Sequence, residues 1–283
     1  MSGQRGTKLK NLLDAVPHGF LVDAAWLSRQ NVSTSSVFDY LQRGWLERVT
    51  RGLYRRPFVG QDTREAGMDW RPYILSLQSI MHYDVHVGGV SALALYGHIH
   101  YLPMTDAGAL YLYATHYPAW LSRLPIRTPL IIRTCNLFGD KPVGLGDRTP
   151  TSKNDGDQTT AGAWRWSVKA SSPERAILEA LNELPTHGSF ENIDMLFQGF
   201  LTLRPRLLME LLTTCRSVKV KRLFFVFADR HNHPWLKYLD KDAINLGSGT
   251  RALVKGGKLH PRYHIYVPEE FARIMGKGDS DGA

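Results

Sequence analysis

The pattern of apolar and polar residues is most regular between residues 21 and 57, where it predicts two short helices. The first helix is expected over about 22–30 and the second over about 35–43, from the spacing of their apolar positions. Ser33 or Thr34 can accept hydrogen bonds from the first free amide groups of the second helix and so cap it. Two helices joined by a short turn are typical of a helix-turn-helix.

The second helix is expected to have an apolar face and a polar face. Val37, Phe38 and Leu41 form an apolar stripe that we expect to pack inward. The opposite face carries Ser35, Ser36, Asp39, Tyr40 and Arg43. A helix with a narrow polar outer face can enter the major groove of DNA.

A β-hairpin is predicted directly after this helix, which ends at Gly44. Residues 45–50 alternate in the manner of a strand, Arg51–Gly52 forms a corner, and residues 53–56 return before a proline. Two helices followed by a basic hairpin predict a winged helix-turn-helix domain over residues 1–60, in which the wing can hold phosphates.

The charge of this segment agrees with a nucleic-acid partner. Residues 1–60 contain nine Lys and Arg residues against four Asp and Glu residues. Six of the nine cations lie in the second helix, in the wing or just before them, where a phosphate-contacting surface would be. A small helical module that binds another protein remains the alternative, but the placement of the charge favours DNA.

The whole chain has 283 residues, which is long enough for two domains. A net charge of +9 indicates a polyanionic partner or an acidic protein. Two separate cysteines, Cys135 and Cys215, suggest reduced, buried side chains in place of a disulfide framework or metal cluster. The sequence shows no signal peptide and no run of about 18 apolar residues, so we expect a cytoplasmic protein without a membrane partner.

Strand-like and helix-like segments alternate after residue 60, which predicts a larger mixed α/β domain over 61–283 and an α+β protein overall. The apolar run 223–228 suits either a buried strand or a buried helix. Residues 139–162 are expected to form an exposed, mobile loop, and residues 276–283 a disordered tail. Helices are expected from Ser172–Pro173 onward and over 8–16, 190–201 and 205–213, and strands over 109–114, 130–134 and 164–168.

Catalytic signatures are weak, and we predict neither catalytic residues nor a metal or cofactor. His82 and His86 have the spacing of two metal ligands on a helix, but no third ligand has clear spacing. A nuclease usually needs clustered carboxylates for Mg²⁺, and the acidic residues lack such spacing. A DNA-targeted enzyme such as a nuclease and a ligand-responsive transcription factor remain the alternatives to a non-enzymatic DNA-binding protein.

Five segments in a fixed order resemble a known family. They are the wing at 45–54, GGVSALALYGHIHY at 88–101, SPERAILEAL at 172–181, KRLFFVFA at 221–228 and INLGSGTRALVKGGK…RYHIYVP at 244–268. In this order the chain resembles the AbiEi antitoxins of bacterial abortive-infection toxin–antitoxin pairs. The resemblance implies a transcriptional repressor that binds inverted repeats upstream of its own operon, as a monomer or a dimer, and counters a partner toxin of nucleotidyltransferase type.

The resemblance also assigns residues to these roles. DNA contacts are expected from Ser33, Thr34, Ser35, Ser36, Tyr40 and Arg43, with phosphate contacts in the wing from Arg48, Arg51, Arg55 and Arg56. The surface that neutralises the toxin is less well fixed by motif. We expect it in the basic stretch that holds Lys219, Lys221, Arg222 and Trp235.

Overall fold

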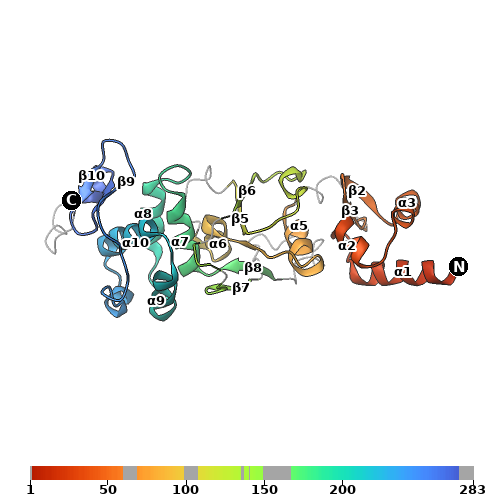
Figure 1. Ribbon diagram of the computed structural model, residues 1–283, viewed down its shortest axis with the longest axis horizontal. Helices are drawn as coiled ribbons and strands as arrows, with labels where there is room; N and C mark the ends of the chain where they lie inside the picture. Colours follow the sequence, from red (N-terminus) through yellow and green to blue (C-terminus); the bar gives the residue numbers. More distant parts are fainter. Residues whose placement is uncertain are drawn as a thin grey trace. The chain divides into compact units, whose positions relative to one another are not determined.

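The computed structural model describes residues 2–59, 69–98, 108–134, 137–139, 141–148 and 167–273. The chain divides into two compact units. Figure 1 labels their helices and strands. Both contain helices and strands, so the predicted α+β class is confirmed. The predicted tail lies outside the described residues, and so does most of the predicted loop. Unit 1 comprises residues 1–86, 112–134 and 147–169, and unit 2 comprises residues 87–111, 135–146 and 170–283.

Unit 1 begins with three helices and a small antiparallel sheet whose strand order is β1-β3-β2. Gly52 has a φ of +78°, a left-handed conformation that suits glycine in the hairpin turn. This arrangement fits a winged helix-turn-helix, and the two predicted helices are displaced by only one or two residues at each end. The elements are α1 (Ser2–Ala15), β1 (Leu21–Asp23), α2 (Ala24–Arg29), α3 (Thr34–Gln42), β2 (Glu47–Thr50) and β3 (Leu53–Arg55).

The orientation of α3 about its own axis differs from the prediction. Val37 and Tyr40 are buried, and the ring centroid of Tyr40 lies 5.7 Å from that of Trp45. Phe38 is 60% exposed. The predictions that Phe38 packs inward and Tyr40 points outward were therefore wrong. The amides of Trp45 and Leu46 both donate to the Tyr40 carbonyl, at 2.9 and 3.2 Å. These bonds tie the turn that follows α3 to the end of the helix.

The buried carboxylate of Asp23 ties β1 and α2 to later parts of unit 1. It caps α2 by accepting from the Trp26 amide at 2.7 Å. The same side chain accepts from the Tyr83 hydroxyl at 2.6 Å and from the Trp120 indole at 3.2 Å. Burial, together with the hydrogen bond to Asp23, raises the pKa of Tyr83 to about 12. Residues 1–60 are therefore packed within unit 1 with segments that follow them, and the predicted domain limits at 60 and 61 stay a prediction.

The helical segment that begins at Arg71 changes from an α-helix to a π-helix partway along its length. α5 (Arg71–Leu75) continues as the π-helix η1 (Ser76–Ile80). The Ser76 hydroxyl accepts from the Leu21 amide at 2.8 Å, and the side-chain amide of Gln78 donates to the Val85 and Lys169 carbonyls. The π-helical turn thus supplies polar contacts to β1, to Val85 and to Lys169, three segments of unit 1.

A five-stranded sheet has the order β6-β5-β4-β8-β7, and β4 pairs with β8 in parallel. β7 lies inside residues 139–162, so the prediction of a loop was wrong for residues 145–148. Among the described residues, no helix combines the length and apolar character needed to cross a bilayer. The strands are β4 (Val85–Val87), β5 (Leu110–Ala114), β6 (Leu130–Arg133), β7 (Leu145–Arg148) and β8 (Val168–Ser171), with the 3₁₀ turn η3 at Leu121–Arg123.

Unit 2 is built mainly from helices around the centrally buried α10 (Val218–His231). The run 223–228 belongs to this helix, which settles the choice between strand and helix. The Ser217 hydroxyl caps its first turn by accepting from the Val220 amide at 3.3 Å. α7 (Pro173–Glu183), α8 (Phe190–Gly199) and α11 (Glu269–Ala272) pack against it. The other helices of unit 2 are α6 (Gly89–Leu95) and α9 (Pro205–Thr214), which pack against α7, and the 3₁₀ turn η5 (Pro234–Tyr238).

The end of unit 2 forms a small sheet with the order β10-β11-β9, in which β11 is antiparallel to β10 and parallel to β9. Its strands are β9 (Arg251–Ala252), β10 (Lys258–His260) and β11 (Ile265–Val267). In the helical core of unit 2, the buried rings of Phe190, Phe197, Phe227 and Phe271 stack or tilt against one another. Cys215 is a free, buried thiol, as predicted, and burial raises its pKa.

Candidate nucleic-acid interface

The N-terminus of α3 is shaped by serine side chains. The Ser33 hydroxyl accepts from the Ser36 amide at 3.2 Å, and it lies 2.9 Å from both the Ser35 and the Ser36 hydroxyls. Ser33 is therefore the cap, as one of the two predicted alternatives had it. Thr34 and Ser35 are exposed on the first turn, where they can donate and accept hydrogen bonds.

Three of the predicted cations lie exposed around α3 and the wing. Arg43 follows α3 and sits over the Trp45 ring at 5.3 Å from its centroid. Arg48 on β2 and Arg51 at the hairpin corner are exposed. This combination of a polar helix start with exposed guanidinium groups is suited to phosphate oxygens, because an arginine fork can donate two parallel hydrogen bonds.

The other two wing cations are engaged inside unit 1. Arg55 forms an ion pair with Glu47 on the neighbouring strand and lies over the Phe58 ring at 4.9 Å. The Arg56 guanidinium donates to the Val16 carbonyl at 2.8 Å and to the Leu13 carbonyl, which satisfies the last turn of α1. The phosphate role predicted for Arg55 and Arg56 therefore conflicts with their contacts here.

Phe38 lies on the exposed face of α3, although its apolar character predicts a place in the core. The exposed strip of α3 runs through Thr34, Phe38 and Gln42, which are spaced four residues apart and so share one face. Ser36 is half-buried and Tyr40 is buried; both lie two residues from Phe38 and therefore on the opposite face of the helix, away from this strip. No local signal in the sequence places Phe38 outward, because the fold sets the orientation of α3 by burying Val37 and Tyr40.

The basic stretch predicted to face a toxin does not form a surface. Trp235 is 4% exposed, and its indole donates to the Phe200 carbonyl at 2.7 Å. Lys219 donates to the carbonyls of Asn182 and Leu184 at 2.7 and 2.8 Å, which completes the end of α7. Lys221 is buried. These residues stabilise unit 2, so the prediction that they form an interaction surface was wrong for the buried ones.

Arg222 has the most specific structural role of that group. Its guanidinium is buried and donates to four backbone carbonyls that lie beyond η5 in the sequence. The acceptors are the carbonyls of Leu246 at 2.8 Å, Gly247 at 3.0 Å, Gly249 at 2.7 Å and His264 at 2.9 Å. Burial lowers the pKa of Arg222, yet these four acceptors replace the water that the charged group has lost.

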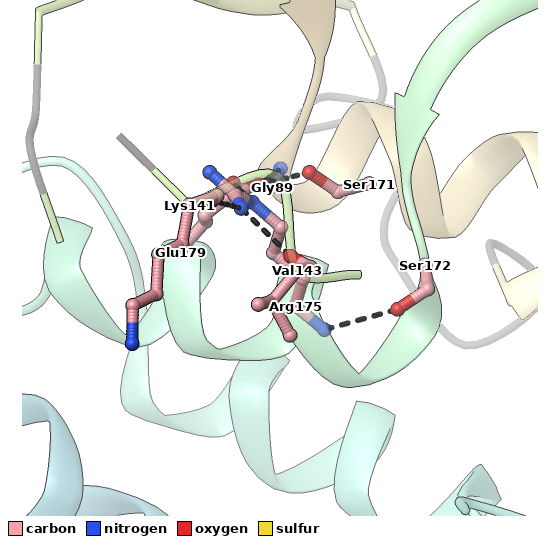
Figure 2. A network of polar contacts seen from close by, with 7 residues as sticks. All are labelled: Gly89, Lys141, Val143, Ser171, Ser172, Arg175 and Glu179. Atoms are coloured by element: carbon pink, nitrogen blue, oxygen red, sulfur yellow. Dashed lines mark hydrogen bonds and ion pairs between the residues drawn. The ribbon is translucent and has the colours of Figure 1, made fainter. Parts of the chain in front are cut away.

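A second polar network lies at the start of α7, as Figure 2 shows. The Glu179 carboxylate accepts from the Gly89 amide at 2.9 Å and from the Ser171 hydroxyl at 2.8 Å. The Arg175 guanidinium donates to Glu179 at 2.9 Å and to the Val143 carbonyl at 2.8 Å. This buried network holds unit 2 together and leaves no oxygen of Glu179 directed at solvent.

A cavity of about 430 Å³ lies in unit 2 beside this network. Its walls include Tyr111, Glu183, His187 and Asn192. It is the feature that a ligand-responsive regulator would use.

His82 and His86, which have the spacing of two metal ligands on a helix, do not share a helix, because η1 ends at Ile80 and His86 belongs to β4. Within the part of the chain that the structure describes, no group of three or more His, Cys, Asp or Glu side chains is placed to hold a metal ion.

Comparisons with known proteins agree with this organisation. Residues 5–104 match the sequence model of a family described as "Transcriptional regulator, AbiEi antitoxin N-terminal domain". Residues 108–268 match one described as "Transcriptional regulator, AbiEi antitoxin, Type IV TA system". No curated protein sequence matches the chain. The crystal structure of the RV2827C protein from Mycobacterium tuberculosis is similar, with a TM-score of 0.54 and 14% identity over 93% of this chain and 90% of that one. At this identity the likeness shows a shared fold.

Proposed function

The chain belongs to the family of AbiEi antitoxins, which are transcriptional regulators of type IV toxin–antitoxin systems, and from this premise we propose that it represses its own operon. In this proposal the winged helix binds inverted repeats in the DNA upstream of the gene. The observation that carries it is the exposed face of α3 with Arg43, Arg48 and Arg51 exposed around it. A helix supplies contacts to base edges in the major groove, and the wing cations supply contacts to phosphates.

The electrostatics of the wing support this assignment. Glu47, the carboxylate on β2, is paired with Arg55, so the exposed charge of the hairpin comes from Arg48 and Arg51. Each phosphate contact made by such a cation releases condensed counterions from DNA, and the affinity then falls steeply with salt. A monomer on each repeat and a dimer across both repeats are equally compatible with this arrangement.

The proposal also includes an antitoxin role for residues 61–283, directed against a nucleotidyltransferase-like toxin. Its support is the family membership of residues 108–268. The buried positions of Lys221, Arg222 and Trp235 remove them as contact residues, and Lys219 remains half-buried in its hydrogen bonds to α7. The surface that opposes the toxin must therefore be sought among other exposed residues of this part of the chain.

Operator binding is tested with the full chain and the DNA fragment immediately upstream of the gene, in mobility-shift titrations at two salt concentrations. The wild type is expected to bind this fragment more tightly than random DNA. The double variant Arg48→Ala/Arg51→Ala should bind more weakly. The slope of log affinity against log salt concentration should become smaller in magnitude by about two, because about one is expected for each phosphate contact removed. Lys255→Ala, an exposed cation of unit 2, is the matched control.

Equal binding to random and upstream DNA by the wild type would refute the repressor proposal. Cleavage of the fragment in Mg²⁺ would instead favour the nuclease alternative, in which the winged helix targets an enzyme. A shift in affinity on addition of small-molecule extracts would favour the ligand-responsive alternative.

The antitoxin role is tested by expressing the chain together with a nucleotidyltransferase-like gene adjacent to its own. Growth should be restored by the wild type and also by Arg48→Ala/Arg51→Ala, because that variant changes DNA contacts alone. Both genes are expressed from a promoter that the chain does not regulate, so that repression of transcription cannot account for the restored growth. Failure of the wild type to restore growth would contradict the antitoxin role and leave the operator experiment unaffected.

A further inference from the structure

Phe38 is the large apolar side chain at the middle of the exposed strip of α3. It is 60% exposed, and it lies one turn after Thr34 and one turn before Gln42, both of which are also exposed. The buried face of α3 is supplied by Val37 and Tyr40. The packing of the helix therefore does not require Phe38, and its ring is presented to whatever partner approaches this face.

A single exposed apolar residue is common on protein surfaces and by itself indicates nothing. The position of Phe38 is what matters, because the polar residues before and after it can hydrogen-bond to base edges. The cations Arg43, Arg48 and Arg51 are exposed nearby in the sequence, after α3 and along the wing. This charge is complementary to DNA, and the helix is the one that the proposed function places in the major groove.

The major groove offers an apolar side chain one distinctive partner. Each base pair displays hydrogen-bond donors and acceptors there, but only thymine adds a methyl group, at C5. A phenyl ring can contact this methyl group and exclude water from it, whereas contact with the polar edges of other bases would leave their donors and acceptors unsatisfied. Phe38 would therefore discriminate thymine from cytosine at one position of the bound site.

From these observations we infer that Phe38 is a specificity-determining residue that contacts the C5 methyl group of a thymine in each repeat. This inference rests on the proposed function, because it requires that α3 enters the major groove of the upstream DNA. It adds a prediction about sequence that the basic surface alone does not make. Phosphate contacts position the protein, and the contact of Phe38 with the base selects the site.

The test replaces thymines of the upstream fragment one at a time with deoxyuridine, which removes only the methyl group. Affinities of the full chain are measured by fluorescence anisotropy. For the wild type, at least one substitution should weaken binding roughly fourfold, the factor for one buried methyl group. Phe38→Ala should bind the thymine fragment more weakly and show equal affinity for thymine and deoxyuridine at that position.

Two further variants test whether the loss of discrimination is specific to the ring of Phe38. Phe38→Leu retains an apolar side chain and should keep part of the discrimination. Leu201→Ala removes an apolar side chain that is 66% exposed in unit 2, and it should behave as the wild type. Because Phe38 is exposed, circular dichroism and thermal unfolding should show that Phe38→Ala is folded.

Three outcomes overturn the inference. The wild type could prefer the upstream fragment and yet tolerate deoxyuridine at every thymine. Phe38→Ala could retain full discrimination, which would assign the methyl contact to another residue. Sedimentation could show that Phe38→Ala loses a dimer while its discrimination is intact, which would make Phe38 a contact between two copies. A wild type without preference for the upstream fragment would instead refute the proposed function itself.

Discussion

Arg175 donates to Glu179 at 2.9 Å from one turn earlier on α7, and both side chains are buried. The same carboxylate accepts from the Gly89 amide and the Ser171 hydroxyl, and the same guanidinium donates to the Val143 carbonyl. One ion pair thus joins the start of α6, the end of β8 and the segment before β7. A charge pair in the interior is tolerated when further hydrogen bonds support both groups, as the contacts with Gly89, Ser171 and Val143 do here.

Glu179→Ala should therefore destabilise the protein strongly. It leaves the charge of Arg175 buried without its partner, which typically costs about 3–5 kcal/mol. The free energy of unfolding is measured by urea denaturation followed by circular dichroism. Glu210→Ala, which removes an exposed carboxylate from α9, is the control and should change stability by less than about 0.5 kcal/mol. Equal effects of the two substitutions would show that the network contributes little.

Because α3 buries Tyr40 and exposes Phe38, we expect alanine substitutions at these two residues to have very different effects on stability. Tyr40→Ala should lower the free energy of unfolding by about 3–5 kcal/mol, because a buried ring is replaced by a cavity. Phe38→Ala should change it by less than about 0.5 kcal/mol, since its ring is mostly exposed. Thermal unfolding of the two variants distinguishes the assignments. If Phe38→Ala were the less stable variant, the original prediction of the inward face would be correct.

Two arginines of the predicted wing, Arg56 and Arg51, should affect different properties: Arg56 the stability of the fold and Arg51 the binding of DNA. Arg56→Ala removes the donor to the Leu13 and Val16 carbonyls and should cost about 1.5–3 kcal/mol of stability, the range for hydrogen bonds of charged groups. Arg51→Ala should leave stability unchanged and reduce the salt slope of DNA binding by about one. Both quantities are measured on both variants. A smaller salt slope with normal stability for Arg56→Ala would restore Arg56 to the phosphate-contacting set.

Arg222→Lys tests the four-carbonyl contact in unit 2. A lysine keeps the charge but has a single ammonium group, which cannot reach all four carbonyls in the planar geometry of a guanidinium. Backbone amides in residues 246–267 should exchange with solvent at least about fivefold faster, the factor for about 1 kcal/mol of lost local stability. Arg251→Lys, at an exposed position, is the matched control for hydrogen-exchange mass spectrometry. Unchanged exchange in both variants would contradict a role for Arg222 in holding this segment.

Asp229 should make unit 2 sensitive to acid. Burial alone would raise the pKa of Asp229, but hydrogen bonds from Lys241, Tyr263 and Arg262 hold it below the ordinary 3.8. A carboxyl group whose pKa is lower in the folded state stabilises the fold above its unfolded pKa, and this contribution is lost as the pH falls through the folded pKa. Asp229→Asn should therefore lower the melting temperature at pH 7, and the difference from the wild type should shrink below about pH 4.

Melting temperatures at several pH values between 7 and 3 check this expectation. Asp242→Asn removes an exposed carboxylate of the same unit and is the control. A difference that is constant over the whole pH range would mean that Asp229 acts through its shape and hydrogen bonds alone, without a contribution from its charge.

The sequence by itself determined the positions of several helices, although it left the run 223–228, which lies in α10, open between strand and helix. The second helix of the winged helix was expected over 35–43 and lies at 34–42, and the start of α7 was correctly placed at Ser172–Pro173. The signals are local: a serine accepts from an amide three residues later, and apolar spacing spans two turns. The resemblance of five ordered segments also identified the family correctly, since such an order is a property of the sequence alone.

Only the tertiary structure decided which side of α3 is buried and what the cations do. Phe38 and Tyr40 differ by two residues, or about 200° around a helix, so at most one can face the core, and hydrophobicity does not choose between two aromatic rings. The role of Arg222 depends on carbonyls 24 to 42 residues away. A basic residue in a sequence predicts an exposed charge, because burial of a charge is costly unless distant groups satisfy it, and those groups are brought together only by the fold.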